Sequence, residues 1–257
     1  MQLHHVEYGR RHGGTPIVFL GSIASHTDMW LNQLDVLSHE HHVIALDHRG
    51  HGLSQDPEVE PFTTGIDDLV DDILTTLDEL GVEDFRVVGL SLGGVLAQYL
   101  AATSERVESA AFLCTAAYFG GEDKWRPRSE LTRAEDMDPM LDGVLGLWVT
   151  DGFQANYPAT TDFYRRMILS TRGVGYASCA DALAQWDFRE RLGEITCPVL
   201  TLAGEQDAST PPSALETIAA GVGGEVTSVV VSPGAHVPTI EAAEQVNDAL
   251  VEFFSRY

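Results

Sequence analysis

The chain has 257 residues, of which 44% are hydrophobic and 21% charged. This length and composition allow a large buried core and exclude a disordered chain. Its 39 Asp and Glu residues against 15 Lys and Arg give a formal net charge of -24, which excludes nucleic acid and anionic membranes as partners. Apolar runs are too short to span a bilayer, and the polar N-terminus does not resemble a signal peptide, so we expect a cytoplasmic protein.

Short apolar runs alternate with longer amphipathic segments, which predicts an α/β fold: a mostly parallel sheet with helices on both faces. The expected strands cover residues 3–9, 16–20, 43–46, 85–89, 107–114, 198–203 and 226–231. The clearest helix covers residues 66–80, where apolar side chains recur every three or four positions before Gly81. Further helices are expected at residues 95–102, after Pro212, and in a closing segment that carries Ile240, Ala243, Val246, Leu250 and Phe254.

The alternation stops between Gly120 and Arg189, where prolines and glycines interrupt a mixed sequence. We therefore expect a core formed by residues 1–119 and 190–257, with a helical lid inserted at residues 120–189. The lid holds eight basic and eleven acidic residues, whereas the remaining chain holds seven basic and 28 acidic ones. More than half of the cations thus lie in the lid, where a guanidinium can bind a carboxylate through two hydrogen bonds.

Gly89-Leu-Ser91-Leu-Gly93 follows an expected strand and precedes an expected helix, which is the context of a nucleophile elbow. Glycines allow the sharp turn that exposes the serine, and the amides at the start of the helix point to the space above it. We expect Gly94 to let the helix lie close to the sheet. The pattern predicts that Ser91 is a catalytic nucleophile.

A serine nucleophile needs a base, and chain order in this kind of fold is serine, acid, histidine. Nine of the ten histidines precede Ser91, so His236 is the one candidate base. The orienting acid is expected after a late strand, in Ala203-Gly-Glu-Gln-Asp207. We favour Asp207, with Glu205 as the rival that a turn at Gly204 would leave facing solvent.

The loop after residues 16–20, Gly21-Ser22-Ile23-Ala24, is expected to supply a second oxyanion donor. Alignment on the preceding strand predicts that the Ile23 and Leu92 amides form the pair. An ordinary strand-to-helix turn is the alternative interpretation of this loop.

The sequence also contains residue types that bind metals or nucleotides in other proteins, but their spacing does not predict such a site. His39, His41 and His42 lack metal-ligand spacing and are expected at a helix end. The loop Asp47–Gly52 lacks the G-x-G-x-x-G order and is expected to pack near the site. Cys114, Cys179 and Cys197 have no C-x-x-C spacing, so we expect them to be buried and reduced. We expect no cofactor and no metal.

Taken together, these stretches resemble the α/β-hydrolase superfamily and, within it, the 3-oxoadipate enol-lactonases. The resemblance extends over nearly the whole chain. It rests on Asp28-Met-Trp30, Asp47–Ser54, Gly89–Gly94, Arg133–Met137, Gly175–Ala182, Ala203–Pro212 and Gly234-Ala-His236. The stretches at 133–137 and 175–182 lie in the lid, where such enzymes differ by substrate. One departure from the superfamily is Gly21-Ser22 in place of the common His-Gly, which tells against generic esterases more than against the lactonases.

The resemblance implies hydrolysis of 3-oxoadipate enol-lactone to 3-oxoadipate in aromatic catabolism, through an acyl-enzyme on Ser91 with Asp207 and His236, without a cofactor. The substrate is a small carboxylated lactone. Arg133 is the leading candidate for binding its carboxylate, and Trp148, like Trp125 and Trp186, is a candidate for lining the pocket. The sequence does not determine the oligomeric state.

Two other interpretations remain open. The same triad serves a carboxylesterase, a carbon–carbon bond hydrolase or a perhydrolase of the haloperoxidase type. The other interpretation is a non-catalytic ligand sensor on the same fold. The complete set of Ser91, Asp207 and His236 argues against it.

Overall fold

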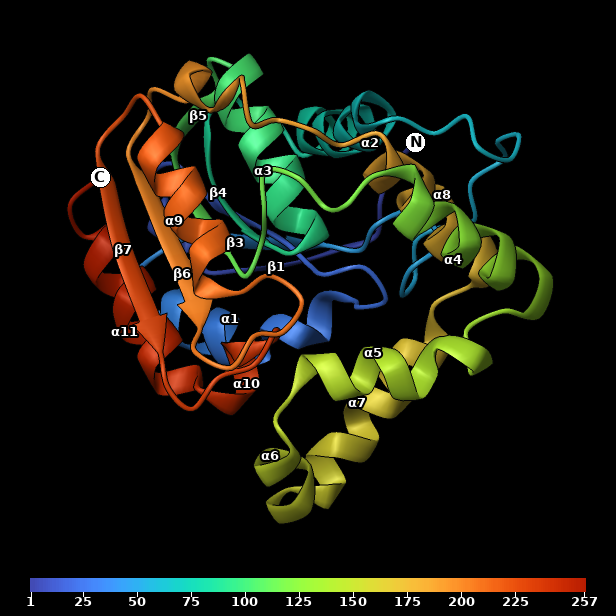
Figure 1. Ribbon diagram of the computed structural model, residues 1–257. Helices are drawn as coiled ribbons and strands as arrows, with labels where there is room; N and C mark the ends of the chain where they lie inside the picture. Colours follow the sequence, from blue (N-terminus) through green and yellow to red (C-terminus); the bar gives the residue numbers. More distant parts are fainter.

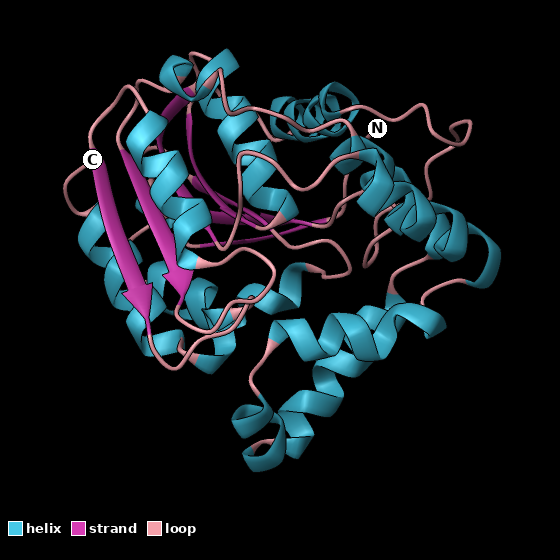
Figure 2. Cartoon of the chain, in the orientation of Figure 1, coloured by secondary structure: helices cyan, strands magenta, loops and turns pink.

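A seven-stranded sheet forms the centre of the computed structural model, which describes residues 1–257 (Figures 1 and 2). The strand order is β1-β3-β2-β4-β5-β6-β7, with β1 antiparallel to β3 and every other pair parallel. The strands are β1 (His5–Tyr8), β2 (Ile17–Leu20), β3 (Val43–Leu46), β4 (Phe85–Leu90), β5 (Val107–Leu113), β6 (Val199–Gly204) and β7 (Val226–Val231). The prediction of a mostly parallel sheet is confirmed.

Helices cover both faces of the sheet (Figure 1). On one face lie α2 (Ile66–Glu79), α3 (Leu92–Thr103) and α9 (Pro212–Gly221). On the other face α1 (Leu31–Leu37) packs against α11 (Ala243–Phe254). The short α10 (Pro238–Glu241) precedes α11, so the closing segment forms two helices, whereas we expected one. Ala242, with φ -124° and ψ 38°, separates them, and Glu241 at the end of α10 accepts hydrogen bonds from Thr150.

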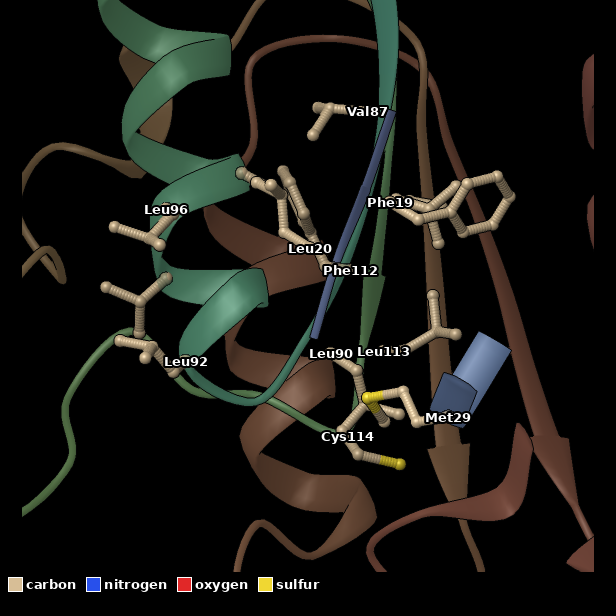
Figure 3. Packing of buried hydrophobic residues seen from close by; sticks show 14 of the residues in the cluster. Phe19, Leu20, Met29, Val87, Leu90, Leu92, Leu96, Phe112, Leu113 and Cys114 are labelled. Carbon is tan, nitrogen blue, oxygen red and sulfur yellow. The ribbon is translucent and has the colours of Figure 1, made fainter. Parts of the chain in front are cut away.

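Apolar side chains pack on both sides of the central strands. Both faces of these strands are covered by helices, and such strands carry continuous hydrophobic runs. Figure 3 shows Leu20, Val87 and Phe112 on the side of α3, and Phe19 and Leu113 on the opposite side. All five side chains are fully buried. This packing fixes the strand ends that carry the site.

Residues 120–189, called the helical segment below, contain no strand of the sheet. The segment consists of α4 (Glu122–Glu135), α5 (Leu141–Trp148), α6 (Asp151–Asn156), α7 (Pro158–Ser170) and α8 (Gly173–Ala184). It leaves β5 and returns towards β6, and a bridge between Tyr118 and Asp187 joins its two ends. In Figure 1, α4 and α8 lie side by side near α2, whereas α5, α6 and α7 extend away from the sheet.

Several expectations at the level of single residues need correction. The predicted strand 3–9 is shorter in the structure, since residues 3, 4 and 9 lie outside β1. The Leu3 amide donates to Thr76 Oγ1 (2.9 Å) and the His4 amide to Ser54 Oγ (2.8 Å) instead of to a strand, and Gly9 has φ 68°. All three cysteines are free, and Cys114 and Cys179 are buried, but Cys197 is only partly buried.

No helix is long and apolar enough to cross a membrane.

Candidate active site

Ser91 stands in the turn between β4 and α3, with φ 57° and ψ -112°. A positive φ is uncommon for a residue with a side chain, and such strain persists only where the surrounding structure enforces it. The Ser91 amide donates to Leu113 O (3.0 Å), and Ser91 O accepts from Thr115 Oγ1 (2.8 Å). Both bonds tie the turn to the end of β5 and hold the serine in this conformation.

The two glycines of the motif are required by close backbone contacts. A Cβ at Gly89 would lie 2.1 Å from Gly93 O, and one at Gly93 would lie 1.9 Å from Leu20 O. A Cβ at Gly94 would lie 2.5 Å from the Thr115 side chain. Each distance is well inside van der Waals contact, so α3 can start this close to β2 and β5 only with glycine at these positions.

His236 lies in the loop between β7 and α10, and its side chain is buried. Its Nδ1 lies 2.9 Å from Asp207 Oδ2. A carboxylate only accepts, so Nδ1 carries the proton and Nε2 is left as an acceptor. The loop is attached to the helical segment, since the His236 amide donates to Leu147 O (3.2 Å) and the Val237 amide donates to Trp148 O (2.9 Å).

Asp207 lies just after β6 and is held by four donors. Besides His236, these are the Ser209 amide (2.8 Å), the Thr210 amide (3.0 Å) and Thr210 Oγ1 (2.8 Å). Burial alone raises the pKa of Asp207, but the hydrogen bond and charge of His236, together with the Thr210 bonds, outweigh it and place the pKa below the ordinary value. Asp207 is therefore ionised at neutral pH.

Glu205, the rival acid, points away from the histidine. It is exposed, and its Oε2 accepts a hydrogen bond from Ser232 Oγ (2.5 Å). The turn at Gly204 thus separates the two carboxylates in the way we expected.

Ser91 and His236 line one cavity of about 480 Å³ between the sheet and the helical segment. Its apolar wall comes mostly from the helical segment: Trp125, Met140, Val144, Leu147, Trp148 and Tyr176, with Phe119 beside them. Trp148 is thus brought to the cavity as predicted, and its ring meets Tyr164 edge-on at 5.7 Å. Trp186 does not line it, because it stacks on Phe188 at 4.8 Å.

Two backbone amides near Ser91 have no partner in the chain. Ile23 lines the cavity, and Leu92 is the first residue of α3 directly after Ser91. Neither amide donates a hydrogen bond to another residue. Both donors therefore remain available to an oxygen atom above Ser91.

Arg133 does not reach the cavity, which corrects its assignment as the carboxylate-binding residue. Its Nη2 donates to Asp181 Oδ2 (2.6 Å), and its guanidinium lies 5.8 Å from the Phe62 ring. Asp181 is buried, and it also accepts from Ser129 Oγ (2.5 Å) and the Phe62 amide (2.9 Å). A buried carboxylate needs such a cation, so Arg133 joins α4 to α8 and is not free for a ligand.

Lys124 and Arg128 line the cavity in the place we expected Arg133 to occupy. Every Lys and Arg of the chain forms an ion pair with Asp or Glu except these two and Arg11. Instead, Lys124 Nζ lies 5.6 Å and Arg128 Cζ 4.9 Å from the Trp125 ring. Burial and then the Arg128 charge lower the pKa of Lys124. The cavity lining holds these two basic side chains and no Asp or Glu.

The loop Asp47–Gly52 packs beside the site, as expected. Asp47 accepts from the Thr27 amide (2.7 Å) and the Leu53 amide (2.9 Å). Gly50, with φ 66°, meets α8 so closely that a Cβ would lie 2.3 Å from Gly175 Cα. His39, His41 and His42 follow α1, and no three histidine, cysteine or carboxylate side chains gather as metal ligands.

Comparisons with known proteins agree with the fold. Residues 15–142 match the model of the alpha/beta hydrolase fold family. A 3-oxoadipate enol-lactonase of Acinetobacter baylyi is 30% identical over 94% of this chain and 89% of its own. The enol-lactonase from Burkholderia xenovorans is 31% identical with a TM-score of 0.92, over 98% of this chain and 96% of that one. A thermophilic esterase from Thermogutta terrifontis, solved with malate bound, is 27% identical with a TM-score of 0.91, over 99% and 93%. The chain therefore belongs to the α/β-hydrolase fold family as a hydrolase, and within it is similar to the 3-oxoadipate enol-lactonases.

Proposed function

We propose that Ser91, His236 and Asp207 form a catalytic triad that hydrolyses 3-oxoadipate enol-lactone to 3-oxoadipate in the breakdown of aromatic compounds. The observation that carries the proposal is that Ser91 and the Asp207-bound His236 line one cavity. His236 Nε2 takes the proton of Ser91, and Ser91 Oγ attacks the lactone carbonyl carbon. Asp207 keeps the proton on Nδ1 and stabilises the charged imidazole.

The developing oxyanion accepts hydrogen bonds from the Ile23 and Leu92 amides, which have no other partner. Collapse of the tetrahedral intermediate breaks the ring C–O bond, and the enol oxygen leaves with the proton from His236. The released enol becomes the 3-oxo group by tautomerisation. Water, deprotonated by His236, then cleaves the acyl-enzyme and restores the Ser91 hydroxyl.

The charge of the cavity supports a carboxylated substrate. The proposed lactone carries one carboxylate outside its ring, and Lys124 and Arg128 offer two cations without an acidic partner. A guanidinium binds a carboxylate with two parallel hydrogen bonds, and an apolar wall strengthens the attraction. We assign both residues to the carboxylate, and residues 120–189 to a lid over the site.

The test is turnover of authentic 3-oxoadipate enol-lactone by the parent enzyme, beside p-nitrophenyl acetate and a neutral lactone of the same ring size. We expect the carboxylated lactone to have the highest kcat/KM. Ser91→Ala should lower kcat by about 10⁵-fold or more on every substrate that is turned over. A parent that ignores the lactone contradicts the substrate, and a Ser91→Ala variant within tenfold of the parent contradicts the triad.

A carboxylesterase acting on a linear ester of a carboxylic acid is the second candidate. The malate-bound esterase with a TM-score of 0.91 favours it, because malate is a dicarboxylate. The two candidates share the triad and the cation pair and differ only in ring closure of the substrate. A series of linear monoesters of dicarboxylic acids in the same assay separates them.

The three free cysteines agree with the reducing cytoplasm that we propose as the location.

A further inference from the structure

The loop that carries the Ile23 amide contains a tight turn between Ser22 and Ser25. Ser22 O accepts from the Ser25 amide (3.1 Å) and from Ser25 Oγ (2.7 Å), so Ile23 and Ala24 occupy its centre. Ala24 has φ 68°, a left-handed conformation that is strained for a residue with a Cβ. Something outside the turn has to hold it there.

His51 makes the contact that does so. Its Nε2 lies 3.1 Å from the Ala24 amide, and its Nδ1 lies 2.8 Å from Arg49 O. A carbonyl oxygen only accepts, so Nδ1 carries the proton and Nε2 accepts from Ala24. The ring is fully buried and bridges the Asp47–Gly52 loop to the turn.

His48 holds the start of the same turn. Its Nε2 lies 2.9 Å from Gly21 O, which also accepts from the Gly93 amide (3.0 Å). One carbonyl thus connects the turn to the helix that follows Ser91. The two imidazoles meet edge-on at 5.8 Å and bind the turn at both ends.

We propose that His51, as the neutral Nδ1–H tautomer, is a positioning residue that holds the Ala24 amide and thereby aims the neighbouring Ile23 amide at the oxyanion. The proposal rests on the proposed function, because it needs an oxyanion above Ser91. His51 touches neither the substrate nor Ser91; it acts through the backbone of the turn. A displacement of the Ile23 amide by a fraction of an ångström weakens a hydrogen bond that forms fully only in the transition state.

The surroundings of His51 keep it neutral. Burial, then His48, lowers the pKa of His51 to about 3, and the Arg172 and His26 charges act in the same direction, while only the bond to Arg49 O raises it. A charged His51 would have a proton on both nitrogens, and Nε2 could no longer accept from Ala24.

The experiment compares His51→Leu with His51→Gln, using p-nitrophenyl acetate as substrate and phenylboronic acid as the probe of the tetrahedral state. Gln can place an amide oxygen near the Nε2 position, whereas Leu offers no acceptor. We expect His51→Leu to lower kcat by about 10- to 100-fold with KM within about twofold, and to weaken phenylboronic acid binding in parallel. His51→Gln should recover kcat to within about fivefold of the parent.

Thr76→Val is the matched control, since Thr76 lies on α2 outside the cavity and the change removes its buried hydrogen bonds with the Leu3 amide and Asp72 O. It should lower the melting temperature and leave kcat unchanged. A His51→Leu variant with kcat within twofold of the parent, or a His51→Gln variant that loses as much as His51→Leu, overturns the proposal.

A second measurement does not depend on the variants or on turnover. Nitrogen-15 NMR of histidine-labelled parent protein should show His51 as the neutral Nδ1–H tautomer at pH 6. A charged ring, or the Nε2–H tautomer, overturns the proposal even where p-nitrophenyl acetate is not hydrolysed. Absence of turnover by the parent, or activity retained in Ser91→Ala, counts instead against the proposed function.

Discussion

The sheet and the helical segment bring different kinds of residue to one cavity. Ser91 and His236 follow β4 and β7, at the carboxyl ends of parallel strands, where backbone hydrogen bonds fix their positions. Lys124, Arg128 and Trp148 come from helices that pack over that edge. In the proposed function, bond breaking belongs to the sheet and recognition of the substrate to the helices.

Charge separates the two regions as well. The helical segment carries eight cations and eleven acids, and the rest of the chain seven and 28. In the sheet region Arg49 is buried against Asp72 at 2.7 Å. In the helical segment Lys124 and Arg128 line the cavity of Ser91 and His236, and neither pairs with an acid, so this strongly acidic protein presents basic side chains to an anionic ligand there.

After Ser91→Ala, the largest effect is expected from Asp207→Asn in the sheet region. An amide can donate to Nδ1 and turn the imidazole to the wrong tautomer, so kcat should fall about 10⁴-fold. Steady-state kinetics with p-nitrophenyl acetate measures it. Glu205→Gln is the control, because its carboxylate bonds only Ser232, and it should keep parent kcat. Equal losses in both variants would contradict the assignment of the acid.

Arg133→Met tests the helical segment as structure. It leaves the Asp181 carboxylate buried without its cation, and we expect a loss of about 3 kcal/mol in the free energy of unfolding. Urea denaturation measures this, and Asp181→Asn in the same chain should recover part of it. The preference for carboxylated over neutral substrates should not change. Loss of that preference would restore Arg133 to the role the sequence indicated.

Acid should weaken the sheet region through His51. Its pKa is about 3 in the folded protein and about 6.5 unfolded, so between these values the unfolded chain binds the extra proton. The protein therefore loses stability as pH falls from 6.5 towards 3, by about 2 kcal/mol between pH 7 and pH 5 from this group alone. Urea denaturation at pH 7 and pH 5 measures the loss of stability between them. In His51→Gln, which has no imidazole at this position, the loss should be smaller than in the parent by about the contribution of His51. An unchanged difference would mean that folding does not lower the pKa of His51.

The sequence predicts the sheet region well because its signals are local. Ser91 sits in a motif whose glycines meet backbone atoms within a few residues or on the neighbouring strand. His236 follows from chain order, since no other histidine comes after Ser91. The role of His51 was not predicted, because the hydrogen bond from Ala24 joins loops 27 positions apart.

The helical segment is harder to predict because rotation about a helix axis decides which side chains meet the cavity. Arg128 and Arg133 both lie on α4, five residues apart, which places them about 140° apart around the helix. Lys124 and Arg128 are four apart and share one face. Two cations at that spacing around Trp125, with no acid paired to either, were the signal available in the sequence.

Arg128→Gln and Lys124→Gln are expected to have the smallest effect. They are also the sharpest test of the contrast between the sheet, which carries the proposed chemistry, and the helical segment, which carries the proposed recognition. Each removes one charge from the cavity wall and leaves the sheet residues in place. We expect KM for the carboxylated lactone to rise about tenfold in each single variant, the equivalent of about 1.4 kcal/mol, with KM for p-nitrophenyl acetate unchanged. Arg126→Gln is the matched control, because Arg126 is on α4 but pairs with Glu122 outside this cavity. If KM for both substrates rose together, the two cations would shape the cavity wall instead of selecting a carboxylate, and recognition would have to come from elsewhere in the helical segment.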